Sequence, residues 1–266
     1  MSDLPVIASG YRARKLLKKA DPAVRRAYQF MKTHFAGESE TFGWLIRSME
    51  DDLNQYFLVE DSNRTVVALS NSQYLRIRGR ARGSLQSIVV IWHIAVDPDH
   101  RGKGLAKSLY RTIYEDALNT ARRRQHEVLA IVGEAVDEVE GLLNALGRKR
   151  LYYRQGNNWE EVSYLCPPLD YDQSTGAVIG AMTAQHLMIR FVDSRTVVSL
   201  DGLKAIMNTM YHEYLGAKRD YESYRAYVKA KTHLSDLAKE FSNRVGSHSD
   251  RQIYLLSRTE FLYRRS

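Results

Sequence analysis

The sequence predicts an α/β fold followed by a mainly helical extension. Through the first 165 residues, short runs rich in β-branched and aromatic residues recur between turn residues, which is typical of strands. Between these runs apolar residues return at helical spacing, as at Leu105, Leu109, Ile113 and Ala117. After residue 200 helical spacing dominates. We therefore expect strands and helices to alternate in a first domain, with helices added after it.

The expected elements of the first part follow in order along the chain. Asp21-Pro22 predicts a helix start, because aspartate caps free amide groups and proline is tolerated at the first helical position. Before residue 100, we expect a strand at 11–18, helices at 22–35 and 42–53, strands at 55–60 and 65–77 joined by a turn at 61–64, and a strand at 85–96. After it, we expect a helix from 105 to the arginines at 122–124, a strand at 128–132, a helix at 136–146 and a strand at 151–153.

We interpret residues 170–266 as an extension that follows the first domain. Its small, polar segment 170–180 predicts a loop or linker. Asp201 predicts the N-cap of a helix. The other expected elements are a strand at 186–192, helical stretches around 221–227 and at 234–241, and a strand at 253–263. Tyrosines recur here at helical spacing, which suits packing, a cover over an acceptor cleft, or a homodimer interface.

Composition narrows the class of protein. No run of eighteen apolar residues occurs among the 266, so we expect neither a membrane span nor a membrane partner. No secretory signal is visible, and the single Cys166 cannot form an internal disulfide, so we expect a cytoplasmic protein. A net charge of +8 favours anionic partners, among them coenzyme A and nucleic acid.

The segment Arg101-Gly102-Lys103-Gly104-Leu105-Ala106 carries the chemistry. It follows a β-branched run that ends at Pro98, and it leads into an amphipathic helix. Glycines at 102 and 104 permit positive φ, so consecutive amide groups can face one anion together with the free amides of the helix start. Such a place binds phosphate or pyrophosphate. The spacing fits neither the P-loop nor the dinucleotide motif, because no Gly-Lys-Ser/Thr follows and Lys107 replaces the third glycine.

This segment resembles the Arg/Gln-x-x-Gly-x-Gly/Ala signature of the GNAT superfamily of N-acetyltransferases, and the preceding Val96-Asp97-Pro98-Asp99-His100 is similar to that family's approach to the loop. The resemblance implies a mixed, mostly antiparallel central sheet flanked by helices. It implies that residues 101–106 (Arg101, Gly102, Lys103, Gly104, Leu105 and Ala106) cradle the pyrophosphate of acetyl-CoA, the acyl donor. It also implies that the backbone of Ile94, Ala95 and Val96 aligns the thioester and stabilises the oxyanion. We expect the acyl-CoA-binding core at 1–169 and the extension at 170–266, with the strand near 186–192 completing the core sheet.

The catalytic acid and base stay open at this stage. Family members often carry a tyrosine acid at the position that Leu143 occupies here, so Tyr152 or Tyr153 from the next strand would substitute for it, although both also suit a core. His93 is one candidate base, because its ordinary pKa suits proton transfer near neutral pH, but a core histidine fits equally. Glu134, which lies just past a strand end, is the other candidate base. Its position fits a solvated surface residue as well.

These observations predict an acyl-CoA-dependent N-acyltransferase, most simply an acetyltransferase that uses direct attack by a primary amine. A small-molecule amine is the first choice of acceptor and a protein amine the second. A ping-pong route through Cys166 is disfavoured, because no base is adjacent. We expect no metal. The alternatives are a non-catalytic acyl-CoA sensor or protein-binding module, and an enzyme acting on charged tRNA. The basic runs at 76–82, 122–124 and 148–150 would suit the 3′-phosphate of coenzyme A, an acidic protein or an RNA backbone. No nucleic-acid motif accompanies them, and charge runs are usually solvated faces.

Overall fold

A computed structural model describes residues 9–16, 21–35, 42–49, 54–77, 85–135, 149–155, 158–162, 164, 170–172, 174–179, 186–213, 223–246 and 252–265. Its chain divides into two compact units. Unit 1 comprises residues 1–74 and 89–128, and unit 2 comprises residues 75–88 and 129–266. The division at residue 169 expected from the sequence stays a prediction.

Unit 1 begins with strands on which two helices pack. Its elements are β1 (Arg12–Lys15), α1 (Ala23–His34), α2 (Phe42–Ser48), β2 (Asn54–Glu60), β3 (Val66–Arg76), β4 (Gln86–Val96), the 3₁₀ turn η1 (Pro98–His100) and α3 (Leu105–Arg124). The strands lie in the order β1-β2-β3-β4, and β2 pairs antiparallel with both β1 and β3. The Asp61 carboxylate closes the turn between β2 and β3 by accepting from the amides of Asn63 and Thr65. The mostly antiparallel sheet flanked by helices is therefore present, as predicted.

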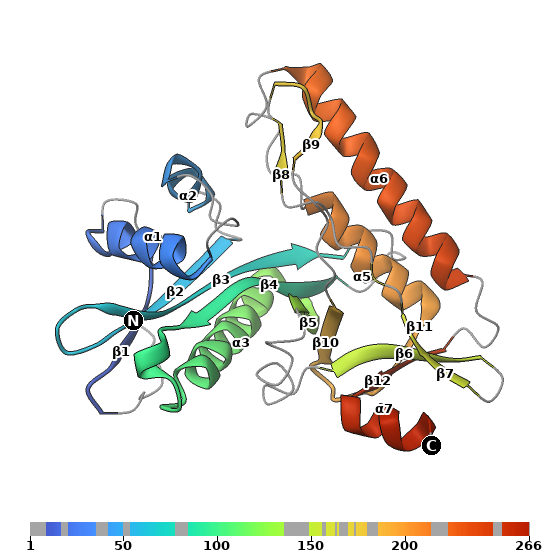
Figure 1. Ribbon diagram of the computed structural model, residues 1–266, viewed down its shortest axis with the longest axis horizontal. Coiled ribbons are helices and arrows are strands. Elements are labelled where there is room, and N and C mark those ends of the chain that lie inside the picture. Colours follow the sequence, from blue (N-terminus) through green and yellow to red (C-terminus); the bar gives the residue numbers. More distant parts are fainter. Residues whose placement is uncertain are drawn as a thin grey trace. The chain divides into compact units, whose positions relative to one another are not determined.

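The core of unit 1 follows from strand alternation. Tyr56 and Leu58 on β2 point to one face, where they pack with Ala27 and Met31 of α1. Phe57 points to the opposite face and lies under the ammonium group of Lys15, 5.4 Å from its ring centre. Figure 1 shows α1 and α3 on the two sides of these strands. Helix α3, which carries the predicted loop at its start, is thus fixed to a buried sheet.

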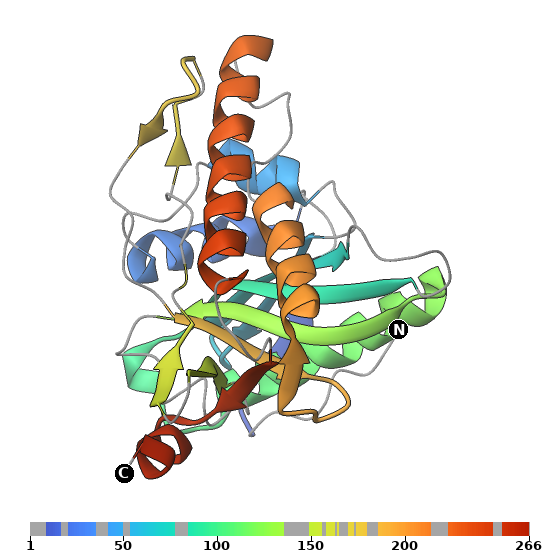
Figure 2. The same cartoon turned by 90° about the vertical axis from the view of Figure 1, so that its right-hand side faces the viewer.

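Unit 2 contains the later strands and the helices of the extension. Its elements are β5 (Glu127–Ala135), β6 (Lys149–Gln155), β7 (Asn158–Glu161), β8 (Asp170–Tyr171), β9 (Val178–Ile179), β10 (His186–Phe191), β11 (Val197–Ser199), α5 (Leu200–Glu213), α6 (Tyr224–Gly246), β12 (Gln252–Leu256) and α7 (Arg258–Arg265). The strands lie in the order β5-β10-β6-β12-β11. Strand β10 pairs antiparallel with β5 and β6, and β12 pairs with β6 and β11. The long α6 lies beside α5 (Figure 2).

Several expected elements differ from those observed in the extension. The strand expected at 253–263 is wrong beyond β12, because Ser257 and Glu260 cap a new helix, α7: the Glu260 amide donates to Ser257 Oγ, and the Ser257 amide donates to the Glu260 carboxylate. The two helical stretches expected near 221–227 and 234–241 form one helix, α6, since neither glycine nor proline separates them. The loop expected at 170–180 contains the short hairpin β8-β9, whose turn is closed by the Asp172 carboxylate.

Two helix starts also differ from those expected, by one residue for α1 and by two residues for α5. Helix α1 begins at Ala23, so Pro22 precedes it, while the Asp21 carboxylate accepts from the Ala23 amide at 2.8 Å. Helix α5 begins at Leu200, before Asp201, because the hydroxyl of Ser199 accepts from the Gly202 amide at 3.1 Å. The helix expected at 136–146, the position of Leu143, and Cys166 lie outside the described residues. Among the helices that are described, none is both long and apolar enough to span a membrane.

Candidate functional site

The predicted phosphate loop lies between β4 and α3 in unit 1. Strand β4 ends at Val96, and η1 follows, capped by the Asp97 carboxylate, which accepts from the Asp99 amide at 3.0 Å. Gly102 and Gly104 then have φ of +76° and +75°, in the left-handed region, and Gly104 is the N-cap of α3. The first i to i−4 amide of the helix is that of Ser108, which donates to the Gly104 carbonyl, so the amides before it have no acceptor within the helix. The loop thus has the backbone conformation that its glycines predicted.

The charge around this loop suits an anion. Arg101, Lys103 and Lys107 are exposed around the loop and first turn of α3. That first turn contains no acidic residue, so no side chain of its own compensates the positive end of the helix dipole. Leu105 and Leu109, both buried, anchor this end of α3 in the core of unit 1. A fixed helix end with free amides and surrounding cations is a place where a phosphate group is stabilised.

The last residues of β4 lead directly into the loop. Ile94, Ala95 and Val96 are all half-buried, and Ala95 packs against the core that α1 covers. The carbonyl of Val96 accepts from Nε of Arg101 at 3.4 Å, which folds the arginine back along the strand end. This strand end and the loop therefore form one continuous surface of unit 1.

His93 faces the same side of β4 as Ala95. Its ring lies 4.7 Å from that of Phe35, just beyond α1, and its Nδ1 atom is buried, although the residue as a whole is partly exposed. Burial lowers the pKa of His93 to about 4, because desolvation disfavours the charged imidazolium. The ring is therefore neutral at pH 7 and accepts a proton weakly, which favours the core interpretation over the general base.

The other three catalytic candidates belong to unit 2. Tyr152 on β6 is buried and stacks on Phe261 of α7, with ring centres 4.3 Å apart. Tyr153 donates from its hydroxyl to the Glu160 carboxylate, and burial, reinforced by this bond, raises the pKa of Tyr153 to about 12. A raised pKa makes a tyrosine a weaker acid toward a thiolate. Glu134 has its backbone in β5, opposite Leu187 of β10, and its side chain lies outside the described part.

Sequence reasoning missed the contacts that Tyr11, the residue before β1, makes around the loop. The hydroxyl of Tyr11 lies 3.0 Å from Nδ1 of His100, and the two rings meet edge to face. The Nζ atom of Lys103 lies 5.6 Å from the centre of the Tyr11 ring and donates to the Asp99 carbonyl at 3.3 Å. A lone tyrosine ninety residues away gives no local signal of this contact. Only the tertiary structure brings it to the loop.

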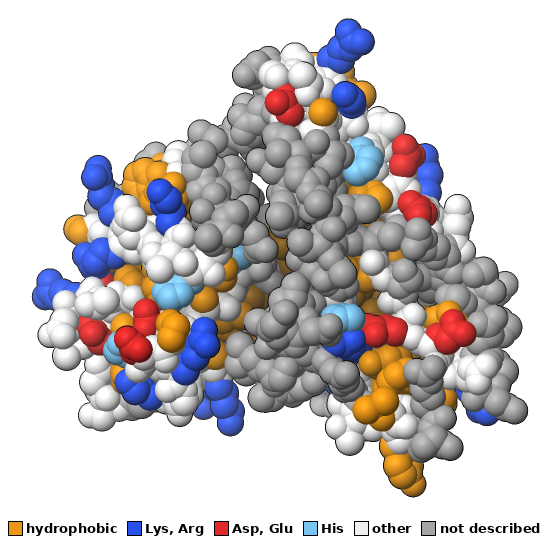
Figure 3. Space-filling model, in the orientation of Figure 1, with side chains coloured by type: hydrophobic (Ala, Val, Ile, Leu, Met, Phe, Trp, Pro, Cys, Tyr) orange, Lys and Arg blue, Asp and Glu red, His pale blue; other side chains and the backbone are white. Residues whose placement is uncertain are grey.

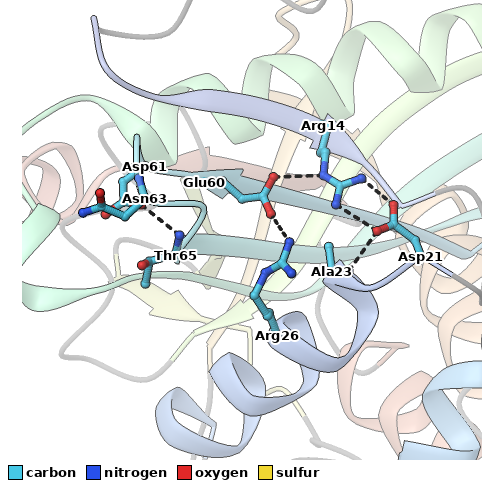
Figure 4. A network of polar contacts seen from close by, with 8 residues as sticks. All are labelled: Arg14, Asp21, Ala23, Arg26, Glu60, Asp61, Asn63 and Thr65. Atoms are coloured by element: carbon cyan, nitrogen blue, oxygen red, sulfur yellow. Dashed lines mark hydrogen bonds and ion pairs between the residues drawn. The ribbon is translucent and has the colours of Figure 1, made fainter.

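A charged network fixes β1 in turn. The Glu60 carboxylate, with its side chain 8% exposed, accepts from Arg14 at 3.1 Å and from Arg26 at 2.6 Å. Arg14 also donates to both carboxylate oxygens of Asp21, which lowers the pKa of Asp21. Figure 4 shows Arg14 between the two acids, with Arg26 reaching Glu60 from α1. The network therefore joins β1 to β2 and α1.

The basic runs noted in the sequence are partly neutralised. Lys149 pairs with Glu260 at 2.8 Å, and the buried Arg150 pairs with Glu161 at 3.1 Å. The positions 78, 80, 82 and 148 lie outside the described residues. On the face drawn in Figure 3, the described Lys and Arg side chains are spread over the surface among acidic and neutral ones. Within the described ranges, no three His, Cys, Asp or Glu residues gather as a metal site.

Comparison with known proteins finds a family match for part of the chain. Residues 25–135 match the model of the Acetyltransferase (GNAT) family, a span that includes most of α1, the strands β2 to β5, the loop and α3. Residues 25–135 are therefore a GNAT acetyltransferase family domain, and acetyl-CoA is the acyl donor typical of that family. No curated protein sequence is similar enough to count as a match.

Solved acetyltransferase structures are similar to this chain at low sequence identity. Arabidopsis thaliana NAA60 in complex with acetyl-CoA has 10% identity and a TM-score of 0.47, over 69% of this chain and 99% of that one. The aminoglycoside N-acetyltransferase AAC(6')-Iy in complex with CoA has 15% identity and a TM-score of 0.41, over 55% and 95%. A GCN5-related N-acetyltransferase from Ralstonia eutropha has 16% identity and a TM-score of 0.39, over 52% and 92%. With TM-scores below 0.5, the family model remains the basis of the assignment.

Proposed function

We propose that this chain transfers the acetyl group of acetyl-CoA to a primary amine by direct attack within a ternary complex. The single observation that carries the proposal is the loop at 101–106, in which Gly102 and Gly104 have positive φ directly before the free amides of α3. These amides, with Arg101 and Lys103, would hold the pyrophosphate. The loop belongs to the segment that the family model matches.

The strand end supplies the next part of the proposed site. In an extended strand, backbone amides and carbonyls project sideways, so Ile94, Ala95 and Val96 would present them to the pantetheine arm and the thioester carbonyl. An amide that faces the carbonyl oxygen stabilises the negative charge that develops there during attack. The amine nitrogen then bonds to the carbonyl carbon, the carbon–sulfur bond breaks, and the thiolate of CoA leaves.

The amine must lose a proton during this reaction. His93 is a weak acceptor because of its burial, and Glu134 remains a candidate on its position in β5 alone. Tyr152 and Tyr153 remain candidate acids, although each is already engaged, with Phe261 and Glu160 respectively. We therefore assign the binding of acetyl-CoA to named residues and leave proton transfer to Glu134 or to water. Replacing Glu134 by Gln should flatten the acid limb of the kcat/KM profile if Glu134 is the base.

The acceptor is proposed to be a small-molecule amine, with a protein amine as the second choice. Release of free thiol from acetyl-CoA, measured with panels of amino sugars, polyamines and N-terminal peptides, tests the reaction. Initial rates at varied concentrations of both substrates should give intersecting lines, as a ternary complex requires. Parallel lines would instead indicate a covalent acetyl-enzyme. Binding of acetyl-CoA without thiol release with any class of amine would favour a sensor over an enzyme.

A further inference from the structure

Tyr11 contacts the phosphate loop at two points. Its hydroxyl is hydrogen-bonded to Nδ1 of His100, the last residue of η1, at 3.0 Å. The face of its ring lies under Lys103, the residue between the two glycines of the loop. The Nζ atom of Lys103 is 5.6 Å from the centre of the ring. One side chain therefore contacts both the entrance and the middle of the loop.

The hydrogen bond does not depend on the protonation state of the imidazole. A neutral His100 with an unprotonated Nδ1 accepts from the Tyr11 hydroxyl. An imidazolium donates from Nδ1 to the same oxygen, so only the direction of the bond reverses. Either form of the imidazole therefore makes this contact with Tyr11.

Tyr11 directly precedes β1, a strand that is joined to the elements around it. On β1, Arg14 bonds to Glu60 of β2 and to Asp21 at the start of α1. The next residue, Lys15, pairs with Asp116 of α3 at 2.7 Å. Because β1 is joined to the helix that follows the loop, Tyr11 and the N-terminus of α3 belong to one fixed frame.

We propose that Tyr11 is a positioning residue for the phosphate loop, which it holds in its binding conformation through His100 and Lys103. This inference rests on the proposed function for the identity of the ligand, acetyl-CoA. A loop with two glycines has many conformations open to it, and fixing them on binding costs affinity. Contacts that fix the loop beforehand reduce this cost. The Lys103 ammonium has three donors, so its contacts with Asp99 and Tyr11 leave it able to bind a phosphate oxygen.

The substitution Tyr11→Phe tests the hydroxyl alone, because it keeps the ring beneath Lys103. We expect the Kd for CoA, measured by calorimetry, to rise about threefold to tenfold, as the loss of one hydrogen bond predicts. The KM for acetyl-CoA should rise by a similar factor while kcat at saturating acetyl-CoA stays unchanged. Tyr11→Leu, which also removes the ring, should raise Kd further. Tyr263→Phe, at a tyrosine that is 83% exposed in α7, is the matched control and should leave Kd unchanged.

A double substitution tests whether Tyr11 acts through His100. In a His100→Ala background, Tyr11→Phe should have little further effect on Kd, because the bond is already absent. Fully additive effects would contradict this route. An unchanged Kd for Tyr11→Phe, in a protein whose wild type binds CoA, would overturn the inference and leave the proposed function intact.

Hydrogen exchange separates the inference from the proposed function. Without ligand, the amides of residues 101–108 should exchange faster in Tyr11→Phe than in wild type, while those of α6 should not change. This result requires no binding of CoA. Equal exchange in the loop would overturn the positioning role even if CoA binds. Failure of the wild type to bind CoA would overturn the proposed function, whatever the exchange shows.

Discussion

The Nζ atom of Lys15 lies 2.7 Å from Oδ2 of Asp116, so an ion pair joins β1 to the middle of α3. The neighbouring Arg14 bonds to Glu60 and Asp21, so the same short strand is also joined to β2 and to the start of α1. Helix α3 supplies the free amides of the proposed pyrophosphate site. The position of these amides therefore depends on contacts made by a strand of only four residues.

The Glu60 carboxylate should contribute to the stability of unit 1. Its side chain is nearly buried and accepts from both Arg14 and Arg26 (Figure 4). Glu60→Gln keeps the shape but removes the charge, which leaves two guanidinium groups near an uncharged amide. We expect the free energy of unfolding in urea to fall by about 2 kcal/mol, less than for a fully buried pair because both arginines are partly exposed.

Glu115 offers a matched control on the surface of α3. It pairs with Arg111 at 2.8 Å one helical turn away, where both side chains are well exposed. Glu115→Gln should lower the free energy of unfolding by at most about 0.5 kcal/mol, since water screens such pairs. If the two substitutions lower the free energy of unfolding by the same amount, the charged network of β1 does not stabilise unit 1.

His93 should make stability depend on pH. Burial lowers its pKa in the folded protein to about 4 from an ordinary value of 6.5. An unfolded chain therefore binds this proton more readily, so the stabilisation is complete above pH 6.5 and is lost as pH falls to 4, by up to about 3 kcal/mol. In His93→Gln, the urea midpoint should vary less between pH 7 and pH 4 than in wild type. The same pH dependence in both proteins would place the ring in contact with water.

Glu260 should also make stability depend on pH, over a lower pH range than His93 does. Its hydrogen bonds from Lys149 and from the Ser257 amide lower its pKa to about 2 from an ordinary 4.5. A carboxylate with a lowered folded pKa stabilises above the unfolded pKa, and this contribution is lost as pH falls from 4.5 to 2. Glu260→Gln should therefore have a lower unfolding midpoint than wild type at pH 6, with the difference closing toward pH 2. A constant difference would mean that the capping charge is unimportant. The exposed Glu127 supplies a control substitution in β5.

Local sequence signals predicted the central part of the site. Pro98 and the two glycines marked the end of β4, the loop and the start of α3 at Leu105, and all three lie where expected. Such signals are reliable because proline and glycine restrict or release the backbone at their own position. The capping pair Ser257 and Glu260 was equally local, and it would have revealed α7.

The tertiary contacts could not be predicted in the same way. The low pKa of His93 depends on burial against Phe35, which a strand pattern does not reveal. The contact between Tyr11 and His100 joins positions 89 residues apart. Nothing in the residues next to Tyr11 distinguishes it from the other sixteen tyrosines of the chain.

Calorimetric titration of acetyl-CoA into wild type and Gly104→Val tests the central claim most directly. A Cβ at Gly104 meets no atom within 4 Å, so valine would act through its φ of +75°, which β-branched residues rarely adopt, and not through a clash within the protein. We expect micromolar binding by the wild type and a loss of at least tenfold in the variant, with the folded state confirmed by circular dichroism. Equal binding by the two proteins would place the pyrophosphate away from this loop, and no binding by the wild type would contradict the assignment of acetyl-CoA itself.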